Sequence, residues 1–207
     1  MFSANPPILI FSPSWRVRDN STKDTLENIK QVKEVVINIV NFSIVEPVSL
    51  ASTEYATGVD EFKKSGLTPL KSNHVKPPRV KESPISFECE VDQIIELGKD
   101  GGAGNLVISR IVHIHVNNKY LDENGSLDTK KLDLVGRMGA SWYTRVIDES
   151  LFEIPKPIHT KGIGVDQLPD HVHSTEILSK NNLARLGNLE KTPSQQEIQE
   201  YRHSNND

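Results

Sequence analysis

The chain has 207 residues, of which 36% are hydrophobic, and a formal net charge of −4. This length suits one domain with a sizeable core, and scattered basic residues in an acidic chain argue against a general nucleic-acid binder. The single cysteine excludes an intrachain disulfide, and short apolar runs without a basic leader predict a cytoplasmic protein that does not enter a membrane.

The first part of the chain predicts a strand, a helix and a second strand. Residues 8–12 begin as a continuous apolar run between prolines, which is typical of a buried strand. Between residues 23 and 33 the apolar residues recur every three positions, so we expect a helix with one apolar face. Ser21 or Thr22 would be its N-cap. Residues 35–40 are rich in β-branched side chains and predict another interior strand.

The middle of the chain predicts a long antiparallel hairpin. Residues 69–84 contain four prolines, so we expect an extended segment along the surface or into a partner. Apolar and polar residues then alternate over 85–97, as in a strand with one face in the core and one in solvent. The glycine-rich segment 98–104 lacks the Gly-Lys-Ser/Thr ending of a phosphate-binding loop. It is better explained as the turn into a second strand over 105–117.

The last part of the chain is less regular. Residues 132–146 fit either a strand or a helix, whereas 174–184 predict a helix. The polar residues 192–207 predict a frayed helix or a disordered tail. Strands outnumber long helices, so the expected fold is mainly β with peripheral helices, built as an antiparallel barrel.

The start of the helix near residue 23 is the first candidate binding site. The first turn of a helix has unpaired N–H groups and the positive end of the helix dipole, and both favour an anion. Lys23 and neighbouring hydroxyl groups would add charge and hydrogen bonds, so a phosphate could bind there. The alternative is an ordinary capped helix without a ligand.

The sequence assigns neither a catalytic side chain nor a metal site. His113 and His115 fall on one face of a strand, but two ligands do not complete a zinc site. A third ligand from His159, His171 or His173 has no spacing in its favour. No Gly-x-Ser-x-Gly motif is present, so hydrolase chemistry has no support.

An ordered series of sequence blocks resembles the flavin reductase-like, FMN-binding split-barrel family. The blocks are Asn5-Pro6-Pro7, Lys23-Asp24-Thr25, Val35-Val36-Ile37-Asn38, Gly58-Val59-Asp60, Pro77-Pro78-Arg79-Val80, Glu82-Ser83-Pro84 and Phe87-Glu88-Cys89. The resemblance implies an antiparallel split barrel over residues 1–188, followed by the polar tail 189–207. Chains of this family usually carry further strands before the Asn-Pro-Pro block, so we expect the barrel to be incomplete at its N-terminus.

The resemblance also implies where a flavin would bind. The Lys-Asp-Thr turn is expected to contact the flavin phosphate, and other contacts come from the first strand and from a loop after the second. The flavin-contacting residues it implies are Ser12, Lys23, Asp24, Thr25, Ser52, Thr53 and Tyr55. For the loop residues the alternative is an ordinary polar loop. Trp142 also matches a family position and would pack at a dimer seam, cover the flavin or belong to the core.

The function that the resemblance implies is NAD(P)H-dependent reduction of flavin by an FMN-binding protein. A homodimer would hold the FMN, and electrons would pass to free flavin, oxygen or a partner monooxygenase. The cofactor performs hydride transfer, so the lack of an acid–base pair is expected. The alternative is a non-catalytic FMN-binding or dimerisation module with the same fold.

Overall fold

The computed structural model describes residues 2–154 and 161–204. The chain forms two compact units, residues 1–151 and 152–207. His159, one of the candidate zinc ligands, lies outside the described residues. The domain boundary at residue 188 stays a prediction.

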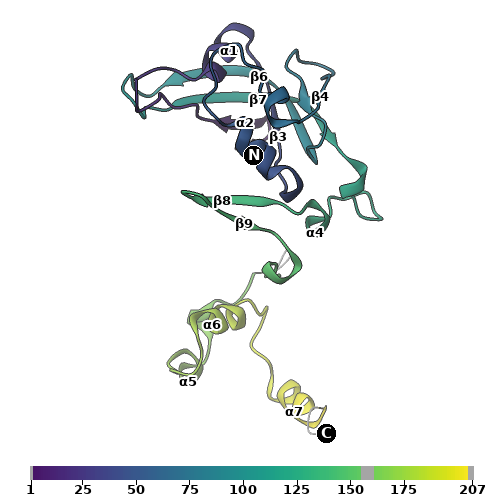
Figure 1. The fold of residues 1–207 in the computed structure, drawn as a ribbon. Helices are drawn as coiled ribbons and strands as arrows, with labels where there is room; N and C mark the ends of the chain where they lie inside the picture. The colour runs from purple at the N-terminus through teal and green to yellow at the C-terminus, as the bar shows by residue number, and fades with distance from the viewer. Residues whose placement is uncertain (1, 155–160, 205–207) are drawn as a thin grey trace. The chain divides into compact units, whose positions relative to one another are not determined.

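The first unit is built on a five-stranded antiparallel sheet with the strand order β1-β2-β7-β6-β3 (Figure 1). Its strands are β1 (Ser3–Ala4), β2 (Pro7–Phe11), β3 (Glu34–Asn38), β6 (Ile85–Glu96) and β7 (Asn105–Val116). The long β6–β7 hairpin forms the centre of the sheet, which confirms the prediction from residues 85–117. The mainly β, antiparallel character is therefore confirmed, although the sheet is open rather than a closed barrel over the described part of this unit.

Short helices and strands surround this sheet. The helices are α1 (Asp24–Val32), η1 (Phe42–Ile44), α2 (Val45–Ala51), α3 (Glu61–Ser65), η2 (Asn118–Tyr120), α4 (Thr129–Leu132) and η3 (Asp148–Ser150). Two further strand pairs are β4 (Pro69–Leu70) with β5 (Arg79–Val80), and β8 (Val135–Gly139) with β9 (Trp142–Arg145). The segment that could be strand or helix in the sequence is thus mainly the β8–β9 hairpin.

The core confirms the amphipathic reading of the first helix. Leu26 and Ile29 of α1 are 1% and 3% exposed. Ile29 packs with Val91 and Val107 of the central hairpin, so α1 covers one face of the sheet with its apolar stripe. Burying such side chains is worth about 1.5 to 3 kcal/mol each, which holds α1 in place.

The other face of β6 differs from the prediction. The alternating pattern predicts that Ser86 and Glu88 face solvent, but they are 3% and 0% exposed. The proline-rich segment covers Glu88, because the backbone N–H groups of residues 73–75 donate to its carboxylate. Ser86 instead donates to Asn38 Oδ1 of β3 at 2.8 Å. The sequence correctly predicts an extended segment over 69–84 but does not reveal that it buries a charged side chain.

The second unit contains η4 (Val165–Gln167), α5 (Asp170–His173), α6 (Lys180–Gly187) and α7 (Gln195–Ser204). The helix expected at 174–184 begins later than predicted, because Ser179 caps α6 through a bond from the Asn182 N–H. Gly187 lies against the backbone of residue 164, with Gly164 N 2.9 Å from Gly187 O. The helix α7 lies in the predicted polar tail, and all its side chains except the half-buried Ile198 are exposed. Among the described residues, no helix has the length and apolar character required to span a bilayer.

Candidate functional site

The first turn of α1 has no side-chain cap. Lys23 is the N-cap residue, with extended backbone angles, and in the part of the chain that the structure describes no side chain caps the first turn. The prediction of Ser21 or Thr22 as the cap is wrong. The Ser21 hydroxyl instead donates to Asp19 Oδ1 at 2.6 Å. The Leu26 N–H donates to the Lys23 carbonyl at 2.9 Å, whereas the N–H groups of Asp24 and Thr25 have no acceptor among the described residues, and no cap neutralises the positive end of the helix dipole.

Arg16 organises the loop that leads into α1. Its guanidinium donates to the backbone carbonyl of Thr22 and, at 3.1 Å, to the Ser21 hydroxyl. Its Nε lies 3.4 Å from Glu54 Oε1, so the same side chain reaches the loop that follows α2. Arg16 thereby joins two segments that are far apart in the sequence.

A second contact joins α1 to this loop. The Thr57 hydroxyl lies 3.2 Å and 3.3 Å from the two carboxylate oxygens of Asp24. The Lys23-Asp24-Thr25 turn and the loop 52–57, which the sequence proposes separately, are thus neighbours on one surface. Lys23 and Thr25 are exposed, and Asp24 is half-buried.

Two of the three predicted residues of the loop are exposed. Ser52 and Thr53 are exposed, whereas Tyr55 is half-buried. Ser52 donates to the Ser49 carbonyl at 2.6 Å, and Lys64 Nζ lies 5.5 Å from the centre of the Tyr55 ring. The polar groups of this loop therefore remain accessible beside the start of α1.

Ser12 lies at the turn of the central hairpin. A Cβ atom placed on Gly104 would lie 2.7 Å from the Ser12 hydroxyl, so the Ser12 side chain lies against the backbone of this turn. Trp15 makes two backbone hydrogen bonds to the 98–104 turn, of 2.9 Å and 3.0 Å. The Nε1 of Trp15 and the Oδ1 of Asn105 are buried, and neither has a hydrogen-bond partner in the described part of the chain. A donor and an acceptor are thus left free near Ser12.

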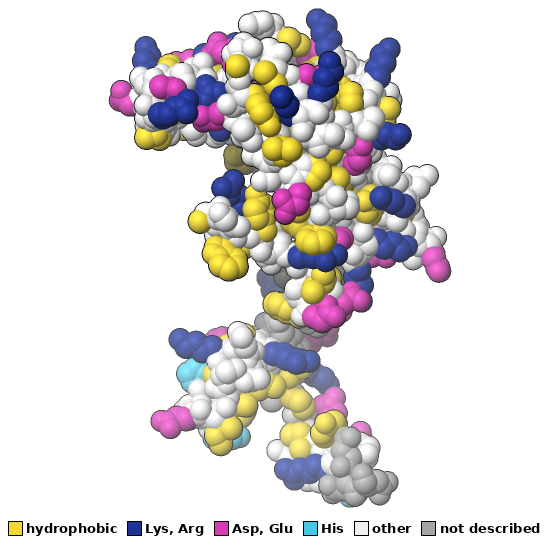
Figure 2. Space-filling view, viewed as in Figure 1, with side chains coloured by type: hydrophobic (Ala, Val, Ile, Leu, Met, Phe, Trp, Pro, Cys, Tyr) yellow, Lys and Arg dark blue, Asp and Glu magenta, His cyan; other side chains and the backbone are white. Residues whose placement is uncertain are grey.

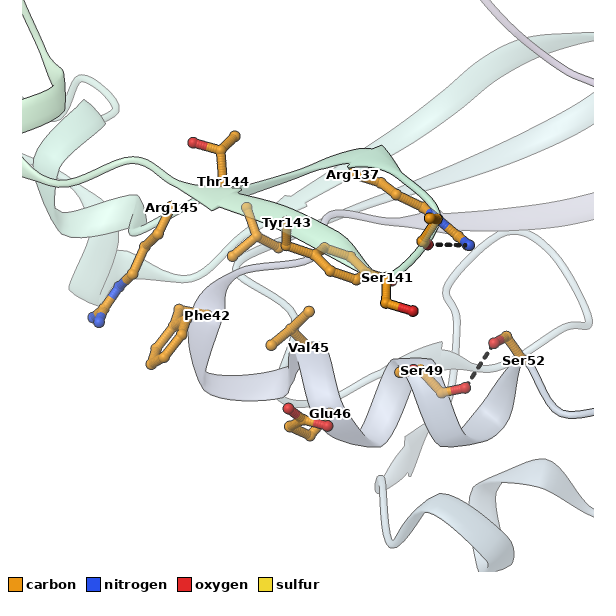
Figure 3. Close-up of a pocket in the computed structure, with 12 residues that line it drawn as sticks. Phe42, Val45, Glu46, Ser49, Ser52, Arg137, Ser141, Tyr143, Thr144 and Arg145 are labelled. Carbon is orange, nitrogen blue, oxygen red and sulfur yellow. Dashed lines mark hydrogen bonds between the residues drawn. The ribbon is translucent and has the colours of Figure 1, made fainter.

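A cavity of about 420 Å³ opens between α2 and the β8–β9 hairpin (Figure 3). Val45 and Ser49 line it from α2, and Tyr143 lines it from β9. The Arg145 guanidinium lies 3.6 Å from the centre of the Phe42 ring at one end of the cavity. Of the seven residues predicted to contact a flavin, Ser52 alone lines this cavity.

The polar face of the β6–β7 hairpin holds a buried carboxylate, Glu88. Burial by itself would raise the pKa of Glu88, but N–H groups of residues 73–75 and the His115 ring lower it to about 2. His113 and His115 share this face as predicted, with ring centroids 4.5 Å apart. In the described residues, no group of three or more His, Cys, Asp or Glu side chains is placed to hold a metal ion.

Cys89 is a core residue, as the alternating pattern predicts. It is 0% exposed. Burial, with a smaller contribution from the Glu88 charge, raises the pKa of its thiol to about 11. A nucleophilic thiolate is therefore disfavoured at this position.

Sequence reasoning missed the residues that join these segments. Arg16, Glu54, Thr57 and Trp15 belong to no motif, and their contacts become visible only in three dimensions. The one signal in the sequence was the group of charged residues near residue 16, because charged side chains in a loop often pair with a distant segment. The spacing alone names no partner.

Residues 1–132 match the model of a family described as the flavin reductase like domain. The chain is 34% identical over 149 residues to an uncharacterised protein of Aquifex aeolicus, covering 72% of this chain and 74% of that protein. It resembles the crystal structure of nitrilotriacetate monooxygenase component B from Bacillus cereus, with 28% identity and a TM-score of 0.66. That match covers 73% of this chain and 74% of the other. The chain also resembles the crystal structure of a putative flavin reductase with a split barrel domain from Shewanella frigidimarina, with 29% identity and a TM-score of 0.62. That match covers 75% of this chain and 73% of the other.

Proposed function

The chain belongs to the flavin reductase-like family, and we propose that it is an FMN-binding protein that accepts electrons from NAD(P)H. The family and its split-barrel neighbours support a flavin-related oxidoreductase. FMN as the flavin and NAD(P)H as the donor form the more specific part of the proposal. Its main structural support is the uncapped start of α1 beside the loop 52–57.

The start of α1 fits the phosphate of FMN. Free N–H groups and the helix dipole attract an anion, and the exposed Lys23 ammonium and Thr25 hydroxyl can add direct contacts. Asp24 is held by the Thr57 hydroxyl and would position the turn rather than contact the anion. A carboxylate in the first turn is itself favourable to the helix.

The surroundings of this turn fit the rest of a flavin. The buried Trp15 Nε1 lacks an acceptor and Asn105 Oδ1 lacks a donor among the described residues, whereas a flavin offers both along its ring edge and ribityl chain. We assign the polar contacts to these atoms and to the remaining predicted residues, Ser12, Ser52, Thr53 and Tyr55. These side chains would orient the cofactor.

The bound flavin would supply the redox chemistry, so the protein needs to bind, orient and shield it rather than provide an acid–base pair. The electron acceptor would be free flavin, oxygen or a partner monooxygenase. The Bacillus cereus neighbour is named as component B of a monooxygenase, which supports the last of these. We propose that the protein works in the cytoplasm.

We propose that the protein is a homodimer and that the β8–β9 hairpin contributes to the interface. Met138 is 69% exposed and Trp142 is 77% exposed. Figure 2 shows hydrophobic side chains at the tip of this hairpin. Apolar side chains gathered on a protruding element are typical of an association surface.

Reconstitution with FMN tests the proposal. The purified protein is incubated with FMN, passed over a desalting column and scanned for flavin absorbance. The retained flavin is then mixed anaerobically with NADH or NADPH. We expect retained flavin absorbance and its bleaching by at least one donor. A protein that retains no flavin would contradict the proposal.

The open sheet favours a second candidate function, a non-catalytic flavin-binding or dimerisation module. The sheet order leaves β1 and β3 as free edges over the described part of the first unit, and β1 has only two residues. An open sheet can bind a flavin without shielding it as a complete barrel would. Retained FMN that neither NADH nor NADPH bleaches anaerobically would favour this candidate.

A further inference from the structure

A second hollow of the first unit, which we call the β5 cleft, has a volume of about 540 Å³. It opens beside β5 and the last residues of β7. The residues that give it its chemistry are Arg79, Lys81, Ser86, His115 and Asn117. Its volume lies within the range of sites for small organic ligands.

The lining of the β5 cleft is basic. It contains two cationic side chains and no carboxylate, although the whole chain has a net charge of −4. Glu88 lies behind His115, but three backbone N–H groups and the His115 ring surround its charge. Glu82 accepts hydrogen bonds from the Thr68 N–H at 3.1 Å and 3.2 Å, so its carboxylate is also engaged. The cleft therefore favours an anionic ligand.

Arg79 has no counter-charge within the described residues. Its Nε is buried and donates to no acceptor in that part of the chain. Arg110 and Arg145, by contrast, each lie within 2.7 Å of a carboxylate oxygen. A buried N–H group without an acceptor is costly, so the position leaves a demand for an acceptor that a water molecule or a bound anion can meet.

The neighbouring hydroxyl groups do not meet this demand. The Ser83 hydroxyl lies 2.8 Å from the carbonyl oxygens of both Ile39 and Ile85, and its one proton is shared between them. Ser86 donates to Asn38 Oδ1 at 2.8 Å. These bonds fix the wall of the cleft and leave the guanidinium of Arg79 available to a ligand. The exposed ammonium of Lys81, whose charge also acts on the Glu82 carboxylate, lines the same cleft.

We propose that the β5 cleft binds the phosphate group of a small ligand, at a site separate from the FMN phosphate at α1. A phosphate offers several acceptor oxygens, which suit the forked donors of Arg79 and the point charge of Lys81. His115 presents its ring at the same wall, with Nε2 turned to Glu88 and no partner for Nδ1 within the described ranges. The phosphate can be free inorganic phosphate or the phosphate of a nucleotide.

The test uses the full chain loaded with FMN, so that the α1 site is filled. Inorganic phosphate, 2′-AMP and adenosine are titrated separately by calorimetry into the wild type, the double variant Arg79→Gln/Lys81→Gln and the control Lys71→Gln. Lys71 is a cation of the same segment that does not line the cleft. Backbone NMR spectra of the wild type locate the bound phosphate, and the melting temperature checks each fold.

Inorganic phosphate and 2′-AMP should bind the wild type and Lys71→Gln equally and shift the signals of residues 79–81 and 115. The double variant should lose about 100-fold in affinity through the loss of two charge-assisted contacts. Tighter binding of 2′-AMP than of phosphate or adenosine would identify a nucleotide as the source, and equal binding would identify free phosphate. If the protein retains no FMN, the same titrations are run on Lys23→Ala/Thr25→Ala, which separates this proposal from the flavin proposal. The proposal of a phosphate site in the β5 cleft would be overturned if neither inorganic phosphate nor 2′-AMP binds the wild type, or if both bind Arg79→Gln/Lys81→Gln as tightly as the wild type.

Discussion

The Glu88 carboxylate and the His115 imidazole meet across β6 and β7, with Oε1 2.5 Å from Nε2. The side chain of Glu88 is fully buried, at 0% exposure. It also accepts backbone N–H groups of Asn73 at 2.8 Å, His74 at 2.6 Å and Val75 at 3.2 Å. A buried charge is tolerated only when such partners surround it, so this carboxylate ties the proline-rich segment to the sheet.

Replacing Glu88 by Gln should destabilise the protein. An amide carries one acceptor oxygen and no charge, so several of the N–H groups now bound by the carboxylate lose a strong partner. We expect Glu88→Gln to lower the free energy of unfolding by about 2 to 4 kcal/mol in urea denaturation. The matched control is Glu90→Gln on the same strand, whose exposed pair with Arg110 should be worth less than about 1 kcal/mol. Equal losses in the two variants would show that the buried network is unimportant.

The same carboxylate should make stability depend on pH. Its donors lower the pKa of Glu88 from 4.5 to about 2 in the folded protein. A lowered pKa means that the unfolded state takes up the proton first, so the contribution is full above about pH 4.5 and is lost as the pH falls towards 2. The lowered pKa corresponds to a contribution of about 3 kcal/mol to the free energy of unfolding at neutral pH. Urea denaturation between pH 6 and pH 2.5 checks this. The difference in the free energy of unfolding between the wild type and Glu88→Gln should become smaller as the pH falls, and a difference that stays constant would contradict the prediction.

Local patterns predicted the central hairpin and α1 because each depends on short-range periodicity. The alternation over 85–97 and the spacing of Leu26 and Ile29 each reflect a single buried face. The same alternation wrongly predicted that Glu88 faces solvent. The pattern shows which face of a strand is polar, but it does not show whether another segment covers that face. That covering segment is joined to β6 by bonds from its own backbone, which no side-chain pattern encodes.

The candidate site was predictable as two separate pieces but not as one surface. The Lys23-Asp24-Thr25 turn and the loop 52–57 each carry recognisable residues. Their proximity depends on Arg16 reaching Glu54 and on Thr57 reaching Asp24, which are tertiary contacts without a sequence signature. The helix cap was missed for a similar reason, because competing bonds engage the hydroxyl expected to cap α1.

Removing the two direct phosphate contacts should weaken FMN binding. Lys23→Ala combined with Thr25→Ala deletes a charge and a hydroxyl while leaving the buried face of α1 unchanged. We expect a loss of about 2 to 4 kcal/mol in the binding free energy, measured by quenching of FMN fluorescence. Lys63→Ala on α3 removes an exposed ammonium elsewhere and should leave the affinity unchanged. If the double variant also binds normally, the turn is only the start of a helix.

Cys89 should resist thiol reagents in the folded protein. Its side chain is 0% exposed, and burial raises the pKa of its thiol to about 11. We therefore expect negligible reaction with Ellman's reagent at pH 8 in buffer, and reaction of one thiol per chain after unfolding in urea. Rapid reaction of the native protein would place this strand at an accessible surface.

Trp142 should contribute to self-association if the β8–β9 hairpin forms part of a dimer interface. Its side chain is 77% exposed, and an aromatic residue buried at an interface commonly contributes about 2 kcal/mol or more. Trp142→Ser should raise the dimer dissociation constant by about 30-fold, measured by sedimentation equilibrium. The control Ile177→Ser removes an apolar side chain that is 91% exposed in the second unit and should leave the constant unchanged. A wild-type protein that stays monomeric, or a dimer that Trp142→Ser does not weaken, would remove the hairpin from the interface.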